Sequence, residues 1–248
     1  MVITYICIFF LGSAFASFIN ATVYRIEKKF KYPKILYEPS HCEKCKKQLT
    51  WIELLPIVGY LLIGGKCSQC KKNINIYYPI SEFFLGVSFL LLYYNDIAWI
   101  YWIILLFLFV LDYHDITYKS IPKNLTHIFI LLCVVIFPIF NLDVVSVVTS
   151  ISVASFLLVL SKLMKKSFGL GDILILLGLG LIVNYKNFLI LFWGGIVIAL
   201  LFSVIYGITS KRSLQKIKIP MLPFFTISYV IALMYGEQIF SFLTGMYL

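Results

Sequence analysis

The chain has 248 residues, of which 61% are hydrophobic and only 13% are charged, and its mean hydropathy is +0.96. A soluble domain of this length would carry about a quarter charged residues, so the composition excludes the soluble globular classes. The net charge of +10 would suggest a nucleic-acid partner in a soluble protein. In a membrane protein, basic residues instead gather in loops on the cytoplasmic side, so we expect lipid surroundings and no nucleic-acid partner.

Apolar segments recur along the whole chain. A helix of roughly 20 apolar residues crosses the ~30 Å hydrocarbon core of a bilayer, although several segments here are shorter and 173–184 is thin for a full crossing. The eight candidate spans are 2–24, 79–94, 97–112, 124–141, 144–161, 173–184, 188–209 and 221–243. The sequence therefore predicts an all-α polytopic membrane protein with about eight transmembrane helices.

Basic residues fix the expected orientation. No Lys or Arg precedes the first apolar run, which indicates a retained helix with its N-terminus outside rather than a signal peptide. The segments that then face the cytoplasm hold 20 of the 21 Lys and Arg residues, as the positive-inside rule requires. These segments are 25–78, 113–123, 162–172 and 210–220, and the external turns are marked by Asn95-Asp96, Asn141-Leu142-Asp143 and Asn184–Asn187.

The same pattern predicts the domain organisation. Residues 1–24 form a first transmembrane helix, residues 25–78 form the one sizeable soluble segment, and residues 79–248 form a transmembrane core. No internal repeat or low-complexity tract stands out.

Four of the six cysteines lie in segment 25–78 as two Cys-x-x-Cys pairs. Two such pairs separated by about this distance are typical of a zinc ribbon, in which four thiolates bind one tetrahedral ion. A cytoplasmic segment keeps its thiols reduced, so disulfides are the poorer interpretation, and redox chemistry remains an alternative. Four thiolates leave no open coordination position, so we expect a structural zinc held by Cys42, Cys45, Cys67 and Cys70. Cys7 and Cys133 fall within apolar spans, where we expect small packing residues.

Acidic residues at the cytoplasmic ends of two spans are the candidate catalytic groups. Asp112 and Asp115 end the third span, and Asp172 follows Gly169-Leu-Gly171 just before the sixth span. Each has a structural alternative: Asp172 can cap the helix that follows, and the other two can be ordinary interfacial charges. Gly169 and Gly171 favour a functional role, because the absence of side chains beside the acid lets another chain approach closely.

A pair of carboxyl groups near a low-dielectric boundary suits peptide hydrolysis. Repulsion keeps one group protonated while the other stays ionised, so that one activates water and the other donates to the scissile carbonyl. Paired acids also serve proton-coupled transporters, which is the alternative function. That alternative predicts acids near the bilayer midplane and related halves, and the sequence shows neither. A non-catalytic zinc-ribbon scaffold is a third interpretation.

These residues carry a resemblance to the type IV prepilin peptidases, the Gly-x-Gly-Asp leader peptidase/N-methyltransferases, across essentially the whole chain. Similar motifs occur in the same order. They are Ser17-Phe-Ile-Asn20 with Arg25, Ser40-His-Cys-x-x-Cys45, Gly65-Lys-Cys-x-x-Cys70, Tyr78-Pro-x-x-Glu82, Asp115-x6-Pro122 and Gly169-x-Gly-Asp172.

The resemblance implies an aspartic peptidase with Asp115 and Asp172 as the catalytic pair, and Asp112 as the fallback. It implies a bacterial inner-membrane location with the site facing the cytoplasm, and prepilin or pseudopilin substrates whose apolar helix follows a short basic leader. Gly169 and Gly171 would contact the substrate backbone. These substrates serve pili, DNA-uptake fibres or secretion pseudopili, among which the sequence does not choose.

The resemblance also implies a second activity, N-methylation of the new N-terminus with S-adenosylmethionine as methyl donor. No nucleotide-binding motif is visible, and Glu82 is a candidate that could equally be an interfacial charge. Three positions depart from the family pattern: Leu174 replaces a usual Lys, Lys123 follows Pro122 where Asp or Asn is common, and Ala16 replaces a usual Gly. Leu174 implies a different charge arrangement beside the proposed catalytic pair.

Overall fold

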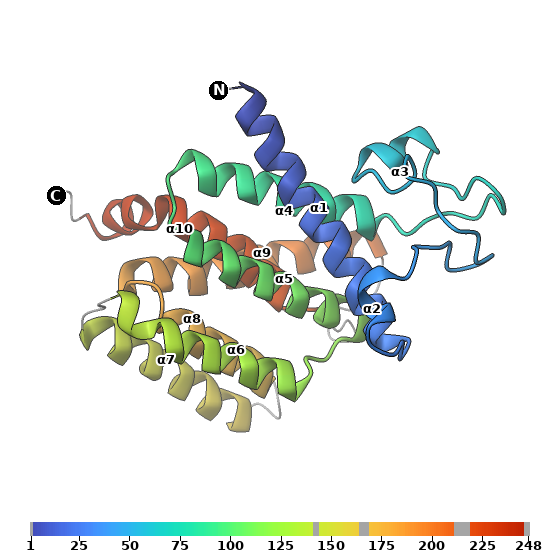
Figure 1. The fold of residues 1–248 in the computed structure, drawn as a ribbon. Helices are drawn as coiled ribbons and strands as arrows, with labels where there is room; N and C mark the ends of the chain where they lie inside the picture. The colour runs from blue at the N-terminus through green and yellow to red at the C-terminus, as the bar shows by residue number, and fades with distance from the viewer. Residues whose placement is uncertain (1, 141–143, 164–168, 211–218, 246–248) are drawn as a thin grey trace. The chain divides into compact units, whose positions relative to one another are not determined.

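The computed structural model describes residues 2–140, 144–163, 169–210 and 219–245, and every described element of regular structure is helical. Figure 1 labels the helices in chain order. The chain divides into two compact units, residues 1–110 and residues 111–248. Helix α5, Trp99–Tyr118, begins in the first unit and ends in the second.

The first unit is built on two apolar helices, α1 (Val2–Glu27) and α4 (Tyr77–Tyr94), which pack against each other. Small residues at the crossing let the two backbones approach closely, as is common where apolar helices meet. A Cβ atom on Gly12 would lie 2.7 Å from the Leu85 carbonyl oxygen and 2.9 Å from Phe89 Cβ, so the site admits only glycine. Two short helices, α2 (Lys34–Tyr37) and α3 (Val58–Leu62), lie in the segment that joins α1 to α4.

The second unit is a cluster of helices around α8. Its members are the end of α5, α6 (Lys123–Ile136) with the 3₁₀ turn η1 (Phe137–Phe140), α7 (Val144–Leu163), α8 (Leu170–Gly180), α9 (Tyr185–Ser210) and α10 (Leu222–Thr244). Helix α8 contacts α6, α7 and α9, and α9 and α10 pack along each other. Serine side chains link several of these helices: Ser150 donates to the Leu177 carbonyl at 3.0 Å, and Ser228 donates to the Ile190 carbonyl at 3.3 Å.

Eight helices of more than ten residues occur among the described residues, one at each predicted span. Five are long and apolar enough to cross a membrane, namely α1, α5, α7, α9 and α10, so this is a multi-pass membrane protein. The prediction of eight spans is not confirmed. Helices α6 and α8 have only 14 and 11 residues, and α4, a continuous helix of 18 residues, contains polar residues such as Glu82.

Two predicted boundaries were wrong in a way that matters for the site. Helix α5 continues six residues beyond position 112, and α8 begins at Leu170 rather than at residue 173. All three candidate acids therefore lie within helices. The expected turn at Asn141-Leu142-Asp143 and most of the basic residues expected in 162–172 and 210–220 lie outside the described residues.

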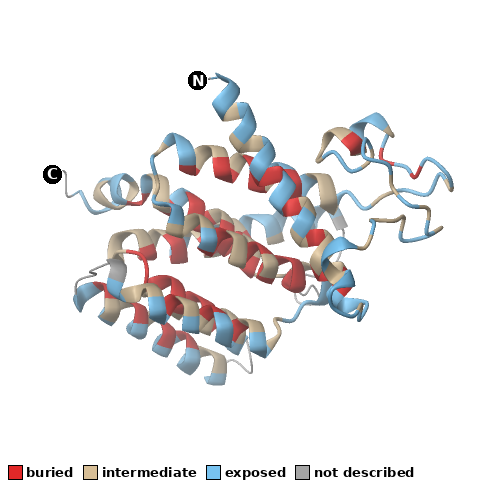
Figure 2. Cartoon of the chain, viewed as in Figure 1, coloured by how far each residue is buried: buried red, intermediate tan, exposed pale blue. Residues whose placement is uncertain are grey.

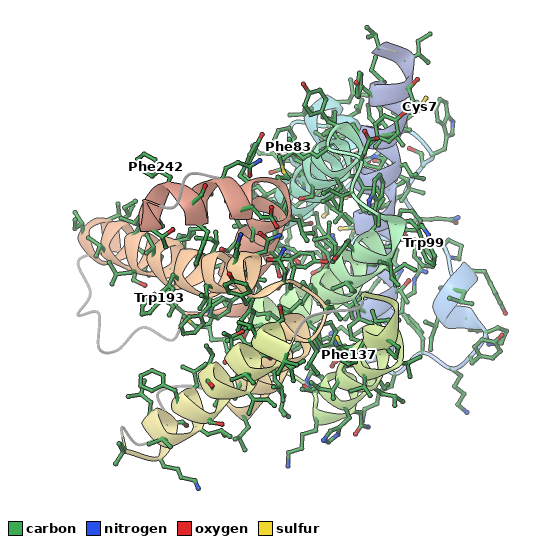
Figure 3. The ribbon with its side chains drawn as sticks, turned by 90° about the vertical axis from the view of Figure 1, so that its left-hand side faces the viewer. Cys7, Phe83, Trp99, Phe137, Trp193 and Phe242 are labelled. Carbon is green, nitrogen blue, oxygen red and sulfur yellow. The ribbon has the colours of Figure 1, made fainter. Side chains whose placement is uncertain are left out.

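Buried and exposed residues alternate along many of the helices, so these helices have a buried side and an exposed side (Figure 2). Many exposed residues are large and apolar, such as Trp193 on α9 and Phe242 on α10, which project from their helices in Figure 3. Apolar outer surfaces of this kind are what a helix in lipid presents. Cys133 is buried as expected, whereas Cys7 is exposed, so the expectation that Cys7 packs inside the protein was wrong.

The contact of α1 with α4 predicts that Gly12→Ala destabilises the protein, because the added methyl group would press against Leu85 and Phe89. We expect a loss of about 1–3 kcal/mol, measured as a lower thermal unfolding midpoint in detergent. Ala14→Val, which adds carbon to an exposed position of the same helix, serves as the control and should leave the midpoint nearly unchanged. Equal stability of Gly12→Ala and wild type would contradict the close packing.

Candidate functional site

The last two turns of α5 carry two acids on a buried face. Asp112 and Asp115 are one helical turn apart, and their exposed fractions are 4% and 8%. A carboxyl group buried to this extent is costly unless hydrogen-bond donors surround it. The donors come from α10, more than a hundred residues further along the chain.

Asp115 lies at the N-terminus of α10. Its Oδ2 atom accepts the backbone N–H of Leu222 at 3.1 Å, and the N–H of Met221 also contributes. The first N–H groups of a helix have no partner within the helix, and the helix dipole favours negative charge there. The contact therefore satisfies both the buried acid and the start of α10.

Asp112 has a different environment. Its Oδ1 atom accepts the hydroxyl of Thr226, which lies one turn further into α10, at 3.0 Å. Thr226 is itself fully buried. Asp112 thus joins α5 to α10 inside the helix cluster, whereas Asp115 meets the end of α10.

Asp172 occupies the third position of α8. Gly169 is the N-cap residue, and its backbone N–H bonds to the Asp172 carboxylate. The structural alternative is therefore partly right, since Asp172 does satisfy a donor at its helix start, in the manner of the acidic residue of a capping box. The carboxylate is also close enough to Asp115 for their charges to repel each other. Asp112 is also within range of the Asp115 charge, so Asp115 interacts with one acid on its own helix and with one on α8.

The two glycines before Asp172 differ in their surroundings. A Cβ atom on Gly169 would lie 3.1 Å from the Asp172 Oδ2 atom, so a side chain there would press on the carboxylate. A Cβ atom on Gly171 would meet Ile121 at an ordinary contact distance of 3.5 Å. Gly169 thus leaves room for the acid itself, while the expected contact of both glycines with a substrate stays a prediction.

The four predicted cysteine ligands lie together in the first unit, with their sulfur atoms within 4.8 Å of one another. The Cys42 and Cys70 sulfurs are 3.9 Å apart, and those of Cys45 and Cys67 are 3.7 Å apart. Four thiolates around tetrahedral zinc, each about 2.3 Å from the ion, place their sulfurs about 3.8 Å from one another. The cluster could therefore bind a metal ion, and its dimensions fit zinc.

The two halves of the cluster are equivalent turns. The Cys42 N–H donates to the Lys47 carbonyl at 2.8 Å, and the Cys67 N–H donates to the Lys72 carbonyl at 3.0 Å. Lys46 and Lys71 occupy matching positions with φ of 62° and 55°. The sequence interpretation, which found no repeat, missed this relation, although the string Cys-x-x-Cys-Lys-Lys occurs twice.

Glu53 links the two turns. Its carboxylate accepts the Ser68 hydroxyl at 2.5 Å, the Thr50 N–H at 2.9 Å and the Lys47 ammonium group at 3.0 Å. These bonds, led by that of Ser68, lower the pKa of Glu53 to about 2. The carboxylate is thus ionised at neutral pH and holds together residues beside both cysteine pairs.

Sequence reasoning also missed Met221, Leu222 and Thr226 as partners of the acids. The only local signal was that Pro223 occupies the first turn of α10, where proline is favoured. That signal marks the start of a helix and does not reveal which distant acid meets it.

Comparisons with known proteins identify the family of the chain. Residues 10–95 match the model of the bacterial peptidase A24 N-terminal domain, and residues 102–208 match the model of the type IV leader peptidase family. The chain belongs to the type IV leader peptidase family.

Relatives in this family cover most of the chain. A prepilin leader peptidase/N-methyltransferase of Neisseria gonorrhoeae is 27% identical over 243 residues, which cover 82% of each protein. The protein of the same name from Bacillus subtilis is 25% identical over 217 residues, covering 84% of this chain and 86% of the relative. One from Pseudomonas aeruginosa is 31% identical over 97 residues, or 31% of this chain and 33% of the relative. No solved structure matches the chain.

The bond between α5 and α10 predicts that Thr226→Val destabilises the protein. Valine has nearly the same shape as threonine but leaves the buried Asp112 without its hydroxyl donor, at a cost of about 1–3 kcal/mol. Thermal unfolding in detergent measures the effect. Thr209→Val is the matched control, because the exposed Thr209 hydroxyl donates only to carbonyls of its own helix. Equal losses in the two variants would argue against the interhelical bond.

Proposed function

We propose that this protein hydrolyses the bond between the leader and the mature part of a prepilin or pseudopilin, using a water molecule activated by Asp115 and Asp172. Membership in the leader peptidase family supports the reaction type. The choice of residues rests on two observations: the charges of Asp115 and Asp172, on separate helices, interact, and Asp112, which also interacts with Asp115, already accepts the Thr226 hydroxyl.

The proposed mechanism divides the work between the two acids. Their repulsion favours a state in which one is ionised and the other protonated. The ionised group takes a proton from water as the water oxygen attacks the scissile carbonyl carbon, and the protonated group donates to the carbonyl oxygen. The carbon–nitrogen bond then breaks, and a proton passes to the leaving amine, which becomes the new N-terminus.

Asp112 remains outside this scheme. Its carboxyl group already accepts the Thr226 hydroxyl, and it is more deeply buried than Asp115. We therefore assign it a structural role.

The proposed orientation places the N-terminus outside, and both the cysteine cluster and the acids at the cytoplasmic face of the inner membrane. The distribution of basic residues supports it. A substrate with a basic leader keeps that leader in the cytoplasm, so the bond to be cut would lie at the same membrane surface.

We propose that Cys42, Cys45, Cys67 and Cys70 hold one structural zinc ion. The segment around them has few buried apolar side chains, and small domains without a sufficient core need such a staple. With four protein ligands, the ion has no position left for a substrate.

The name of the relatives supports a second proposed activity, methylation of the new N-terminal amine. S-adenosylmethionine would supply the methyl group.

The catalytic assignment predicts that Asp115→Asn and Asp172→Asn each slow cleavage of a prepilin from the same organism by about 10²–10⁴-fold. Purified protein in detergent, with the products separated by mass, provides the measurement. Asp112→Asn is the control. It keeps an oxygen that accepts the Thr226 hydroxyl, so cleavage should be largely retained. Normal cleavage by both Asp115→Asn and Asp172→Asn would refute the assignment.

The metal assignment predicts about one zinc ion per purified chain and its loss in Cys42→Ser, because three thiolates and a hydroxyl bind zinc more weakly. Elemental analysis measures the ratio. Cys7→Ser should keep the metal, since Cys7 lies on α1 outside the cluster. Active wild-type protein without bound metal would disprove this role.

A further inference from the structure

The first unit contains a pocket that peptide cleavage leaves unexplained. One wall is a face of α1 formed by residues three or four apart, Ser17, Asn20, Ala21, Tyr24 and Arg25. Tyr78 and Glu82 of α4 form another wall, and the segment 40–75, including Cys42 and Cys67, closes the pocket. The cavity holds about 200 Å³.

Asn20, one of the lining residues, has an unused buried acceptor. It is 2% exposed, and its Nδ2 atom donates to the Ser81 hydroxyl oxygen at 2.9 Å. The Ser81 hydroxyl is already committed as a donor to the Tyr78 carbonyl at 2.8 Å, so Asn20 must turn its N–H group toward Ser81. The Oδ1 atom of Asn20 then has no hydrogen-bond partner, which is costly for a buried oxygen.

Glu82 adds a second acceptor. Its exposed fraction is 8%, and its carboxylate accepts the Ile57 N–H at 2.7 Å. A carboxylate has about four lone-pair directions, so capacity for another donor remains even with the additional Ser17 bond. Among the described residues, no basic side chain forms an ion pair with Glu82.

The basic residues around the pocket do not supply the donor that Glu82 can still accept. Arg25 is buried, but its guanidinium donates to the Ile35 carbonyl at 2.9 Å and to the Ser40 hydroxyl at 3.1 Å. Lys44 and Lys72 are exposed. A ligand that satisfies the pocket must therefore bring its own N–H donors and preferably a positive charge.

The rest of the lining is largely apolar. It includes Ala21, Leu49, Leu54, Leu55, Ile63 and Ile74. The complementary ligand thus combines a cationic nitrogen with a compact apolar body.

We propose that this pocket binds a primary ammonium group attached to an apolar body, held by the Oδ1 atom of Asn20 and the carboxylate of Glu82. The inference deepens the proposed methyl transfer and rests on it. Two participants in that reaction carry such a group, the amino-acid end of S-adenosylmethionine and the new N-terminus of the processed pilin. Asn20 and Glu82 belong to motifs that the cleavage site does not use.

Calorimetric titration of the full-length protein in detergent tests the proposal with two pairs of ligands. S-adenosylhomocysteine, which keeps the amino-acid end of S-adenosylmethionine, is compared with methylthioadenosine, which lacks it; both are thioethers, so the comparison isolates that end. A short apolar peptide that begins with phenylalanine and has a free amine is compared with its N-acetylated form. We expect at least one amine-bearing ligand to bind about tenfold or more tightly than its partner, and the pair that differs identifies the source of the amine.

Glu82→Gln keeps the shape of the side chain and an acceptor for Ile57 but removes the charge, so it should weaken that ligand by at least about tenfold. Asp96→Asn removes a carboxylate charge from an exposed residue outside the pocket and should change binding little. The proposal is overturned if neither ligand pair differs on wild-type protein, or if Glu82→Gln binds as tightly as wild type.

Leader cleavage and methylation of the product are measured by mass on the same preparations. These measurements distinguish failure of the proposed methyl transfer from failure of the proposed amine pocket. Wild-type protein that cleaves but never methylates would refute the proposed second activity. If Glu82→Gln methylates the product as well as wild type does, only the role of this pocket is refuted. Cleavage retained by Glu82→Gln, together with lost binding and methylation, is the supporting result.

Discussion

The bond between the Asp115 carboxylate and the first turn of α10 is the contact on which the second unit depends. It joins residues 107 positions apart in the chain. A buried acid needs donors and a helix start has donors without partners, so each group removes the cost of burying the other. Asp115 also interacts with the charge of Asp172, and one turn away Asp112 accepts the Thr226 hydroxyl of the same helix α10. The hydrogen bonds that join α5 to α10 therefore also fix the positions of Asp112 and Asp115.

This arrangement explains why three acids near one another need not have the same role. Asp112 accepts a side-chain hydroxyl within the helix cluster, and Asp115 accepts backbone N–H groups at a helix end. Asp172 begins a helix of 11 residues whose remaining length is apolar. Asp115 near the end of α5 and Asp172 at the start of α8 both border apolar helical segments, and their charges interact, which is why they form the proposed pair.

The sequence predicted the positions of the helices and the four-cysteine cluster well, because both leave local signals. Long apolar runs mark helices, and two Cys-x-x-Cys pairs mark a metal site whatever the surrounding fold. Helix ends near polar residues were less accurate: α5 runs through Asp112, His114 and Asp115 to Tyr118 because hydrogen bonding continues where hydropathy falls. The partners of the acids, and the free oxygen of Asn20, depend on contacts between distant segments and could not be inferred from composition or spacing.

The segment that carries the four cysteine sulfurs also lines the pocket beside Asn20. It contributes Cys42 and Cys67 to the lining. That segment contains little apolar core, and two of its turns place lysines in a left-handed backbone conformation that side chains disfavour. Such a segment owes its shape to whatever joins its two halves. Loss of the proposed metal ion would therefore loosen the lining of the proposed amine pocket, which lies in the same unit, and would remove none of the contacts described for the acids of the other unit. The supply of zinc to the cell would then determine what fraction of the cleaved substrate is methylated, independently of the rate of cleavage.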